Sequence, residues 1–359
     1  MPYCVVTAAA AMAAVAGAQE EVQIFYQRYG HGATKVLLII GFAGTYESWG
    51  PQVKGLTGAM EPVDEEAPAG DDSGAAEGVE VCCYDNRGMG RSSVPEQKSQ
   101  YTTAIMAKDA LALMDHLGWR KAHVFGHSMG SMIASKLAAM APDRVASLAL
   151  LNTTGGGYQC IPKEYLEEVV GSSTRRQMLY QEYVKGLSSG GMQSRHGFEG
   201  QLNACWTHKL STKELDRIRL AGFLVLIIHG RDDVIAQLYY ARMLAEKLQP
   251  AAKLVELHGG HLVSHERPAE VNMSLMEMIK ASKSNTDLEE WSNLPKKSDA
   301  GSLRKRGGDG VNYLIVTYNL LGKLHLILLF LFGVFYVILE HARRALRVLK
   351  PIRVSASTL

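Results

Sequence analysis

The sequence predicts a protein of the α/β class, with a mostly parallel sheet covered by helices on both faces. Three observations support this expectation. The chain has 359 residues, of which 47% are hydrophobic and 21% charged, and this is enough to bury one large core. Short apolar runs alternate with stretches of helical periodicity. Glycines and polar side chains follow several of these runs directly, where parallel sheets place their active sites.

The predicted strands are continuous runs rich in Val, Ile and Leu, which is typical of parallel strands buried on both faces. In chain order they are Val36–Ile40, Val79–Tyr84, Ala122–Phe125, Val145–Leu151, Phe223–Ile228 and Lys253–Leu257. The helices predicted between and after them are Thr103–Leu117, Met129–Met140, Ile235–Leu248 and Pro268–Ile279.

Charge and cysteine content exclude several classes of protein. The 38 basic and 36 acidic residues give a net charge of +2, whereas a nucleic-acid-binding domain is typically strongly basic. We therefore expect no nucleic-acid partner. The five cysteines are an odd number without CxxC spacing, which argues against a zinc site or a disulfide framework. The adjacent Cys82 and Cys83 are expected to be free thiols pointing to opposite faces of one strand.

A serine nucleophile is predicted behind the third apolar run. Gly126-His127-Ser128-Met129-Gly130 reads G-x-S-x-G between a strand and a helix, so the chain turns sharply and exposes Ser128 at the sheet edge. A second match, Gly186–Gly190, contains Ser188 but has no preceding strand, and is interpreted as a turn. We interpret His127, inside the motif, as a packing or hydrogen-bonding residue.

The base and the acid are expected downstream of the serine, at two further strand ends. Asp233 is favoured over Asp232 because it lies three residues past Gly230, where the loop turns back across the sheet edge. His261 is favoured as the base because the preceding Gly259-Gly260 allows a close approach to the serine. His258 and His265 remain alternative bases.

An oxyanion hole needs two hydrogen-bond donors. The Met129 backbone N–H, at the start of the helix that follows Ser128, is the first candidate. The second is the backbone N–H of Phe42, in the glycine-flanked turn Gly41–Gly44 that leaves the first predicted strand.

At these residues the chain resembles the α/β-hydrolase fold superfamily, of the type with a single Ser-Asp-His triad. The motifs that carry the resemblance are GFAGTYESW at 41–49, YDNRGMGRSS at 84–93, HVFGHSMGSMIA at 123–134, HGRDD at 229–233 and GGHLVSHERP at 259–268. Many members carry His-Gly before the oxyanion turn, where this chain has Ile40-Gly41. Relatives that open epoxides or remove halides place Asp at the nucleophile position, which disfavours both activities here.

The resemblance implies a core formed by residues 21–152 and 223–282, with residues 153–222 inserted between two strands as a helical cap. Met178, Tyr183, Phe198 and Trp206 are expected either to line a pocket or to form the core of the cap. The loop Asp85–Arg87 is expected to be structural.

The expected function is hydrolysis of a carboxylic ester, a thioester or an amide through an acyl-enzyme, with Ser128, Asp233 and His261 as the triad. The substrate is expected to be a small-molecule or lipid ester, and no cofactor or metal is implied. Two alternatives stay open: a membrane-tethered, non-catalytic ligand-binding protein on the same fold, and a hydrolase of carbon–carbon bonds.

The two ends are expected to lie outside the core. Residues 1–20 form an Ala-rich extension without a basic start, so we expect no secretion. Residues 283–310 are interpreted as a polar linker, and residues 311–359 as a hydrophobic tail with a basic end. Segment 311–340 is expected to bind a membrane, by spanning it or lying in its interface, with the catalytic domain facing the cytoplasm. Basic residues on both sides of the segment favour opposite orientations.

Overall fold

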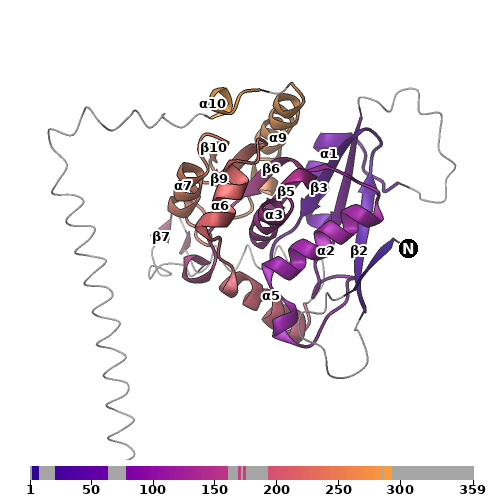
Figure 1. The fold of residues 1–359 in the computed structure, drawn as a ribbon. Helices are drawn as coiled ribbons and strands as arrows, with labels where there is room; N and C mark the ends of the chain where they lie inside the picture. Colours follow the sequence, from indigo (N-terminus) through magenta and orange to yellow (C-terminus); the bar gives the residue numbers. More distant parts are fainter. Residues whose placement is uncertain are drawn as a thin grey trace, which may run out of the picture. The chain divides into compact units, whose positions relative to one another are not determined.

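The computed structural model describes residues 2–7, 21–63, 78–160, 169–170, 173–174, 193–284 and 286–292. All of them belong to one compact unit that spans Met1–Leu294 (Figure 1). The predicted tail at 311–359 and its membrane-binding segment lie outside the described residues. In the part of the chain that is described, no helix combines the length and the hydropathy that crossing a membrane requires.

Eight of the described strands form one large sheet in the order β1-β2-β4-β3-β5-β6-β9-β10, and the short strands β7 Val169–Val170 and β8 Ser173–Thr174 pair with each other in a separate antiparallel sheet. Their bounds are β1 Tyr3–Thr7, β2 Glu21–Tyr29, β3 Thr34–Ile39, β4 Val79–Tyr84, β5 Ala122–His127, β6 Val145–Leu151, β9 Leu224–Gly230 and β10 Ala252–Leu257. The strands from β4 to β10 in this order pair in parallel, whereas β1 and β2 are antiparallel at one edge. Every predicted strand is therefore confirmed as a parallel strand.

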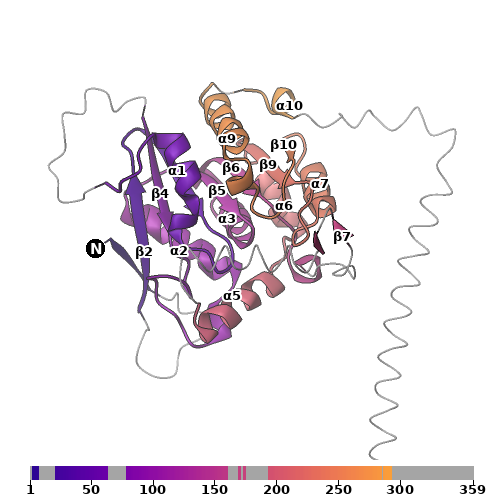
Figure 2. The ribbon, with the colours of Figure 1, turned by 180° about the vertical axis from the view of Figure 1, so that it is seen from behind.

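Helices cover both faces of the sheet. The bounds of the described helices are α1 Gly50–Thr57, α2 Thr103–His116, α3 Met129–Met140, α5 Arg195–Thr207, α6 Thr212–Arg219, α7 Leu238–Lys247, α8 Val263–Glu266, α9 Pro268–Lys283 and α10 Leu288–Trp291. Side chains of α2, α3, α6 and α7 pack into one apolar cluster, and those of α1, α8, α9 and α10 into the other. Figure 2 shows α1 and α9 on the face opposite to α2 and α3.

The adjacent cysteines Cys82 and Cys83 of β4 lie on opposite faces of the sheet. Cys82 belongs to the apolar cluster on one face of the sheet and Cys83 to the cluster on the other. Both are buried and neither forms a disulfide, and their placement on opposite faces is what the alternation of side chains along a strand predicts. Burial raises the pKa of the Cys83 thiol, which keeps it protonated and unreactive.

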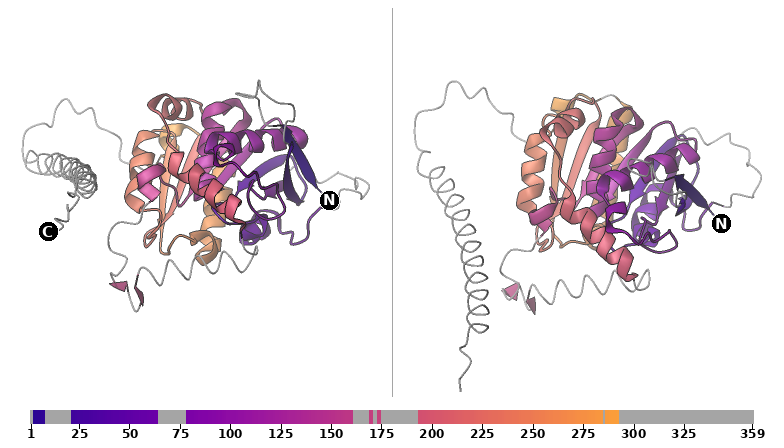
Figure 3. Two further views of the ribbon diagram at one scale, coloured as in Figure 1. Left: turned by 90° about the horizontal axis from the view of Figure 1, so that it is seen from below. Right: turned by 60° about the horizontal axis from the view of Figure 1, so that its bottom comes forward.

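The position of the site follows from the topology. The chain leaves β3 toward α1 on one face, and it leaves the neighbouring β5 toward α3 on the other. Connections that diverge from adjacent parallel strands open a crevice at the carboxyl ends of those strands. Helix α5, from the inserted segment, crosses this edge of the sheet (Figure 3).

The N-terminal boundary of the core differs from the prediction. Residues 1–20 were predicted to form an extension, but Tyr3–Thr7 is an edge strand that pairs with β2. Cys4 is 2% exposed and Val6 is 7% exposed, so one face of this strand adds to the core. The strand itself, YCVVT, is only five residues long, and the Ala-rich run that follows it dominates the composition of residues 1–20 and concealed the strand.

The C-terminal boundary also differs from the prediction. The linker was predicted to begin at residue 283, yet α10 follows as part of the folded unit. The Trp291 indole is 5% exposed, and its Nε1–H donates to the backbone carbonyl of Val225, with 2.9 Å between the two atoms. The Lys253 ammonium lies 4.7 Å from the ring centroid. The folded core therefore extends to Trp291.

Candidate active site

The turn between β5 and α3 forces Ser128 into an unusual backbone conformation. Its φ is 54° and its ψ is −120°, a region that a residue with a Cβ adopts only at a cost of about 1–3 kcal/mol. The flanking glycines make this turn possible. A Cβ on Gly126 would lie 2.2 Å from the carbonyl oxygen of Gly130, and a Cβ on Gly130 would lie 2.0 Å from that of Ile39. The Ser128 side chain is thereby held at the carboxyl edge of the sheet.

The structure brings together the three side chains that were predicted as a triad. The distance from Ser128 Oγ to His261 Nε2 is 2.9 Å, and from His261 Nδ1 to Asp233 Oδ2 it is 2.8 Å. They come from the loops after β5, β10 and β9, which the parallel sheet places at one edge. With Nδ1–H donating to the carboxylate, Nε2 is left as the acceptor of the serine proton.

Asp233 is completely enclosed and fully hydrogen-bonded. Its Oδ1 accepts from the backbone N–H groups of Ile235 at 2.9 Å and Ala236 at 2.8 Å, and its Oδ2 also accepts from Asn152 Nδ2 at 2.6 Å. Burial alone raises the pKa of such a carboxyl. The charge of His261 and the hydrogen bonds it receives outweigh burial and hold the pKa of Asp233 below its ordinary value. It is therefore a carboxylate at neutral pH.

The alternative acid and bases lie elsewhere. Asp232 is exposed, and its backbone N–H donates to Gly259. His258 is exposed, with Nε2 3.5 Å from an Arg231 nitrogen, and His265 is exposed beside Ser264. Ser188 lies outside the described residues.

His127 has the hydrogen-bonding role expected of it. Its Nε2–H donates to the backbone carbonyl of His261 at 2.7 Å, and its ring lies 5.2 Å from the His261 ring. Burial, with the neighbouring His261, lowers the pKa of His127 to about 3, so the imidazole is neutral and a single tautomer donates. This bond ties the nucleophile turn to the loop that carries His261.

The predicted oxyanion loop lies against the nucleophile. A Cβ on Gly41 would lie 3.0 Å from the Ser128 Cβ, so this glycine allows the close approach. No described group accepts a hydrogen bond from the backbone N–H of Phe42 or of Met129. Both predicted donors are thus uncommitted beside the serine.

The Asp85–Arg87 loop forms hydrogen bonds with the chain on either side of the oxyanion loop Gly41–Gly44. Asp85 accepts from the backbone N–H of Tyr46 at 2.8 Å, and Asn86 Nδ2 donates to the Ile40 carbonyl at 2.7 Å. These two contacts hold the chain on either side of the oxyanion loop. The loop is therefore structural, as the resemblance implied.

Sequence reasoning missed two residues of the site. Asn152, at the end of β6, has a φ of 48°, and its Nδ2 also donates to the Gly260 carbonyl at 3.1 Å. It thus joins the loop of the acid to the loop of the base. Gln201, on α5, accepts from the backbone N–H of Ala43. The signal for Asn152 was its place directly behind a predicted strand, whereas nothing local marks Gln201.

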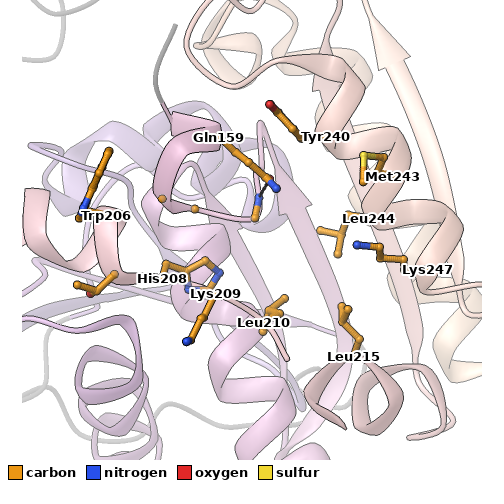
Figure 4. A pocket seen from close by; sticks show the side chains of 14 residues that line it. Gln159, Trp206, His208, Lys209, Leu210, Leu215, Tyr240, Met243, Leu244 and Lys247 are labelled. Carbon is orange, nitrogen blue, oxygen red and sulfur yellow. Dashed lines mark hydrogen bonds between the residues drawn. The ribbon is translucent and has the colours of Figure 1, made fainter. Parts of the chain in front are cut away.

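A cavity of about 660 Å³ lies beside the inserted segment, between the α5–α6 junction and α7 (Figure 4). Its described lining is Gly155, Gly156, Gly157, Gln159, Trp206, Thr207, His208, Lys209, Leu210, Leu215, Tyr240, Met243, Leu244 and Lys247. No triad residue is among them. Of the four residues predicted for a pocket or the cap core, Trp206 lines this cavity and Phe198 packs on Phe42, with ring centroids 5.2 Å apart. Met178 and Tyr183 lie outside the described residues.

Comparison with known proteins identifies the fold. The sequence model of the alpha/beta hydrolase fold family matches residues 35–169. The enol-lactonase of Burkholderia xenovorans LB400 superposes with a TM-score of 0.56 at 22% identity, covering 72% of this chain and 97% of that one. A thermophilic esterase of Thermogutta terrifontis superposes with a TM-score of 0.57 at 20% identity, covering 79% and 99%. Residues 35–169 therefore match the alpha/beta hydrolase fold family, and the chain has the same fold as these two solved structures.

The relatives found by sequence match this chain over only part of their own length. The dihydrolipoyllysine-residue acetyltransferase component of the acetoin cleaving system of Pseudomonas putida is 27% identical, over 71% of this chain and 66% of its own length. RutD of Caulobacter vibrioides is 38% identical, over 34% of this chain and 38% of its own length. The chain thus spans less than two thirds of the length of these relatives.

Proposed function

We propose that the protein is a serine hydrolase that cleaves a carboxylic ester, a thioester or an amide through an acyl-enzyme. The observation that carries the proposal is the continuous hydrogen-bonded line from Ser128 Oγ through His261 to Asp233, beside two uncommitted backbone N–H groups. A serine hydroxyl needs a base to become a nucleophile, and the base needs a group that orients it.

The proposed reaction has two halves. Ser128 Oγ attacks the carbonyl carbon while its proton passes to His261 Nε2, and the resulting oxyanion accepts hydrogen bonds from the Phe42 and Met129 N–H groups. The intermediate then collapses, and His261 gives the proton to the leaving alcohol, thiol or amine. Water attacks the acyl-enzyme with His261 as the base, which releases the acid and restores Ser128.

Labelling with a fluorophosphonate probe tests the proposal, together with hydrolysis of p-nitrophenyl acetate and a panel of lipid esters. Ser128→Ala is expected to remove both labelling and hydrolysis, and Ser188→Ala to remove neither. A parent protein that binds esters without turnover would instead favour the non-catalytic ligand-binding alternative. Cleavage of a vinylogous diketone in preference to every ester would favour the carbon–carbon hydrolase.

We further propose that residues 311–340 bind a membrane and leave the catalytic domain in the cytoplasm. The support is composition alone: Leu324–Leu339 reads LHLILLFLFGVFYVIL, and a basic stretch that suits anionic headgroups follows it. After a carbonate wash, the full chain is expected in the membrane pellet and a chain ending at Leu294 in the supernatant. A full chain in the supernatant would refute this proposal without affecting the catalytic one.

A further inference from the structure

Helix α5 sits on the core through an unusual face. Its buried residues are Gly197, Gly200, Gln201 and Ala204, which are small apart from the glutamine. A Cβ on Gly197 would lie 2.0 Å from the carbonyl oxygen of Gly88, and a Cβ on Gly200 would lie 2.4 Å from the Tyr101 ring. The backbone of α5 therefore rests directly on the core, without intervening side chains.

The large apolar residues of α5 lie on another side of the helix. Phe198 is 38% exposed, Leu202 51% and Trp206 56%. The spacing of four residues places them in one row along the helix. The attachment of α5 to the core thus depends on close backbone contact and on the polar side chain in its buried face, more than on burial of large apolar groups.

That polar side chain is Gln201, which is 0% exposed and has both halves of its amide hydrogen-bonded. Oε1 accepts from the backbone N–H of Ala43 at 3.0 Å, and Nε2 donates to the backbone carbonyl of Arg87 at 3.0 Å. An N–H can only donate and a carbonyl can only accept, so the amide has one possible orientation.

The Arg87 anchor is itself rigid. Two nitrogens of its guanidinium donate to the two carboxylate oxygens of Asp109, each at 2.6 Å, and both side chains are 3% exposed. A buried, bidentate pair of this kind fixes position in two directions. Gln201 therefore links the oxyanion loop to Arg87, which the side chain of Asp109 in turn fixes to α2.

The residue that Gln201 holds is the neighbour of a proposed oxyanion donor. Ala43 has a φ of 56°, a conformation that needs support from its surroundings. The bond to Gln201 fixes the peptide plane between Phe42 and Ala43, and the Phe42 ring packs on Phe198 of the same helix. With Gly41 pressed against Ser128, little freedom is left for the plane that carries the Phe42 N–H.

We propose that Gln201 is a positioning residue that aims the Phe42 N–H at the oxyanion, so that α5 is a fixed part of the active site. The inference rests on the proposed acyl-transfer function. Removing one oxyanion donor typically lowers kcat by about 10²–10³-fold. A donor that is present but misdirected is expected to cost about 10–100-fold in kcat with little change in KM, because it acts mainly in the transition state.

The test compares two substitutions on one helix in the full chain. Gln201→Leu removes the contact with the oxyanion loop. Asn203→Ala is the matched control, because Asn203 Nδ2 donates to the carbonyls of Lys98 at 3.1 Å and Tyr101 at 3.0 Å and so docks α5 without touching that loop. With p-nitrophenyl acetate, kcat is expected to fall in Gln201→Leu only. Affinity for a trifluoromethyl ketone, whose hemiketal oxyanion fills the same hole, is expected to fall by a similar factor.

Gln201→Glu is the second variant, in case the leucine disturbs folding. Its carboxyl keeps an acceptor for Ala43 N–H, but only the protonated form can also donate to the Arg87 carbonyl. The ratio of its kcat to that of the parent is therefore expected to fall as the pH rises. A residue that only docks the helix would show no such profile.

Hydrogen exchange of residues 41–44 separates failure of this inference from failure of the proposed function. Faster exchange in Gln201→Leu, but not in Asn203→Ala, is expected whether or not the chain hydrolyses esters. An active parent whose kcat survives Gln201→Leu would overturn the inference alone. A parent inactive toward all esters and unlabelled by fluorophosphonate would overturn the proposed function, and the catalytic role of Gln201 with it.

Discussion

Replacing Asp233 by Asn tests the triad at a single atom, because the surroundings of the carboxylate dictate how the amide must lie. The backbone N–H groups of Ile235 and Ala236 both point at Oδ1 and cannot turn away. The amide oxygen is therefore expected at the Oδ1 position and the amide NH2 at the Oδ2 position. At Oδ2 the NH2 meets two groups that donate in the parent, His261 Nδ1 and Asn152 Nδ2.

The consequence for His261 is a change of tautomer. Its Nδ1 is expected to give up its proton and accept from the new amide, which places the remaining proton on Nε2, 2.9 Å from Ser128 Oγ. In that tautomer the imidazole cannot take the serine proton. Where an acid of this kind has been replaced by its amide, kcat drops by about 10⁴-fold, which corresponds to about 5.4 kcal/mol in the activation free energy.

The assay is steady-state hydrolysis of a p-nitrophenyl ester at pH 7 to 8, alongside the rate of fluorophosphonate labelling. Asp232→Asn is the matched control, because its side chain is exposed and its backbone N–H, which the substitution keeps, donates to the Gly259 carbonyl. We expect the control to keep the parent kcat within about two-fold. Equal kcat values for Asp233→Asn and the parent, in folded proteins, would refute the tautomer argument and the choice of acid.

Three further predictions concern stability. Trp291→Ala should lower the free energy of unfolding by about 3–5 kcal/mol, because the indole is 5% exposed, whereas Trp206→Ala, 56% exposed, should change it little; urea unfolding of the full chain measures both. Gly130→Ala should abolish activity and destabilise the fold by at least about 1–3 kcal/mol, since its Cβ would meet the Ile39 carbonyl, whereas Gly50→Ala, with open space around it, should be tolerated. Buried histidines should make the protein acid-sensitive. Burial lowers the pKa of His123 to about 4 and the pKa of His127 and of His208 to about 3, and it also lowers the pKa of His229. His123, His127 and His208 stay neutral when folded but bind protons in the unfolded chain below pH 6.5, so each should remove about 1.4 kcal/mol of stability per pH unit between about pH 6.5 and 4. A urea midpoint that does not change from pH 7 to pH 5 would contradict this.

The sequence predicted the parallel part of the sheet well because buried parallel strands are continuous apolar runs, and such runs need no knowledge of their partners. The triad was accessible for a related reason. Each of its members lies within four residues of a strand end, and glycines flank the serine at Gly126 and Gly130. Strand ends and glycines are local features, so one sequence reveals them.

The features that were missed depend on distant partners. Asn152 acts on Asp233, 81 residues away, and Gln201 on Ala43, 158 residues away. Trp291 is buried because it packs into the apolar cluster on one face of the sheet and donates to the Val225 carbonyl, whereas α10 by itself is a single turn in a polar stretch. Residues whose roles arise from tertiary contacts leave no local pattern, so the sequence placed Trp291 in a polar linker and gave Asn152 and Gln201 no role.

Backbone strain gives an independent outline of the site. Among the described residues, the non-glycine residues with positive φ are Ala43, Ser128 and Asn152, at 56°, 54° and 48°. They follow β3, β5 and β6, which are adjacent in the sheet, and they belong to the oxyanion loop, the nucleophile turn and the support of the acid. Each costs about 1–3 kcal/mol and persists only where its surroundings leave no alternative. A hydrogen bond holds the backbone N–H of each of these residues. The Ala43 N–H donates to Gln201, the Ser128 N–H to the Leu151 carbonyl, and the Asn152 N–H to the Ile228 carbonyl. The sheet thus fixes three strained residues at one edge, so that the groups proposed to act on the substrate are positioned before it binds, and no rearrangement is needed during the reaction.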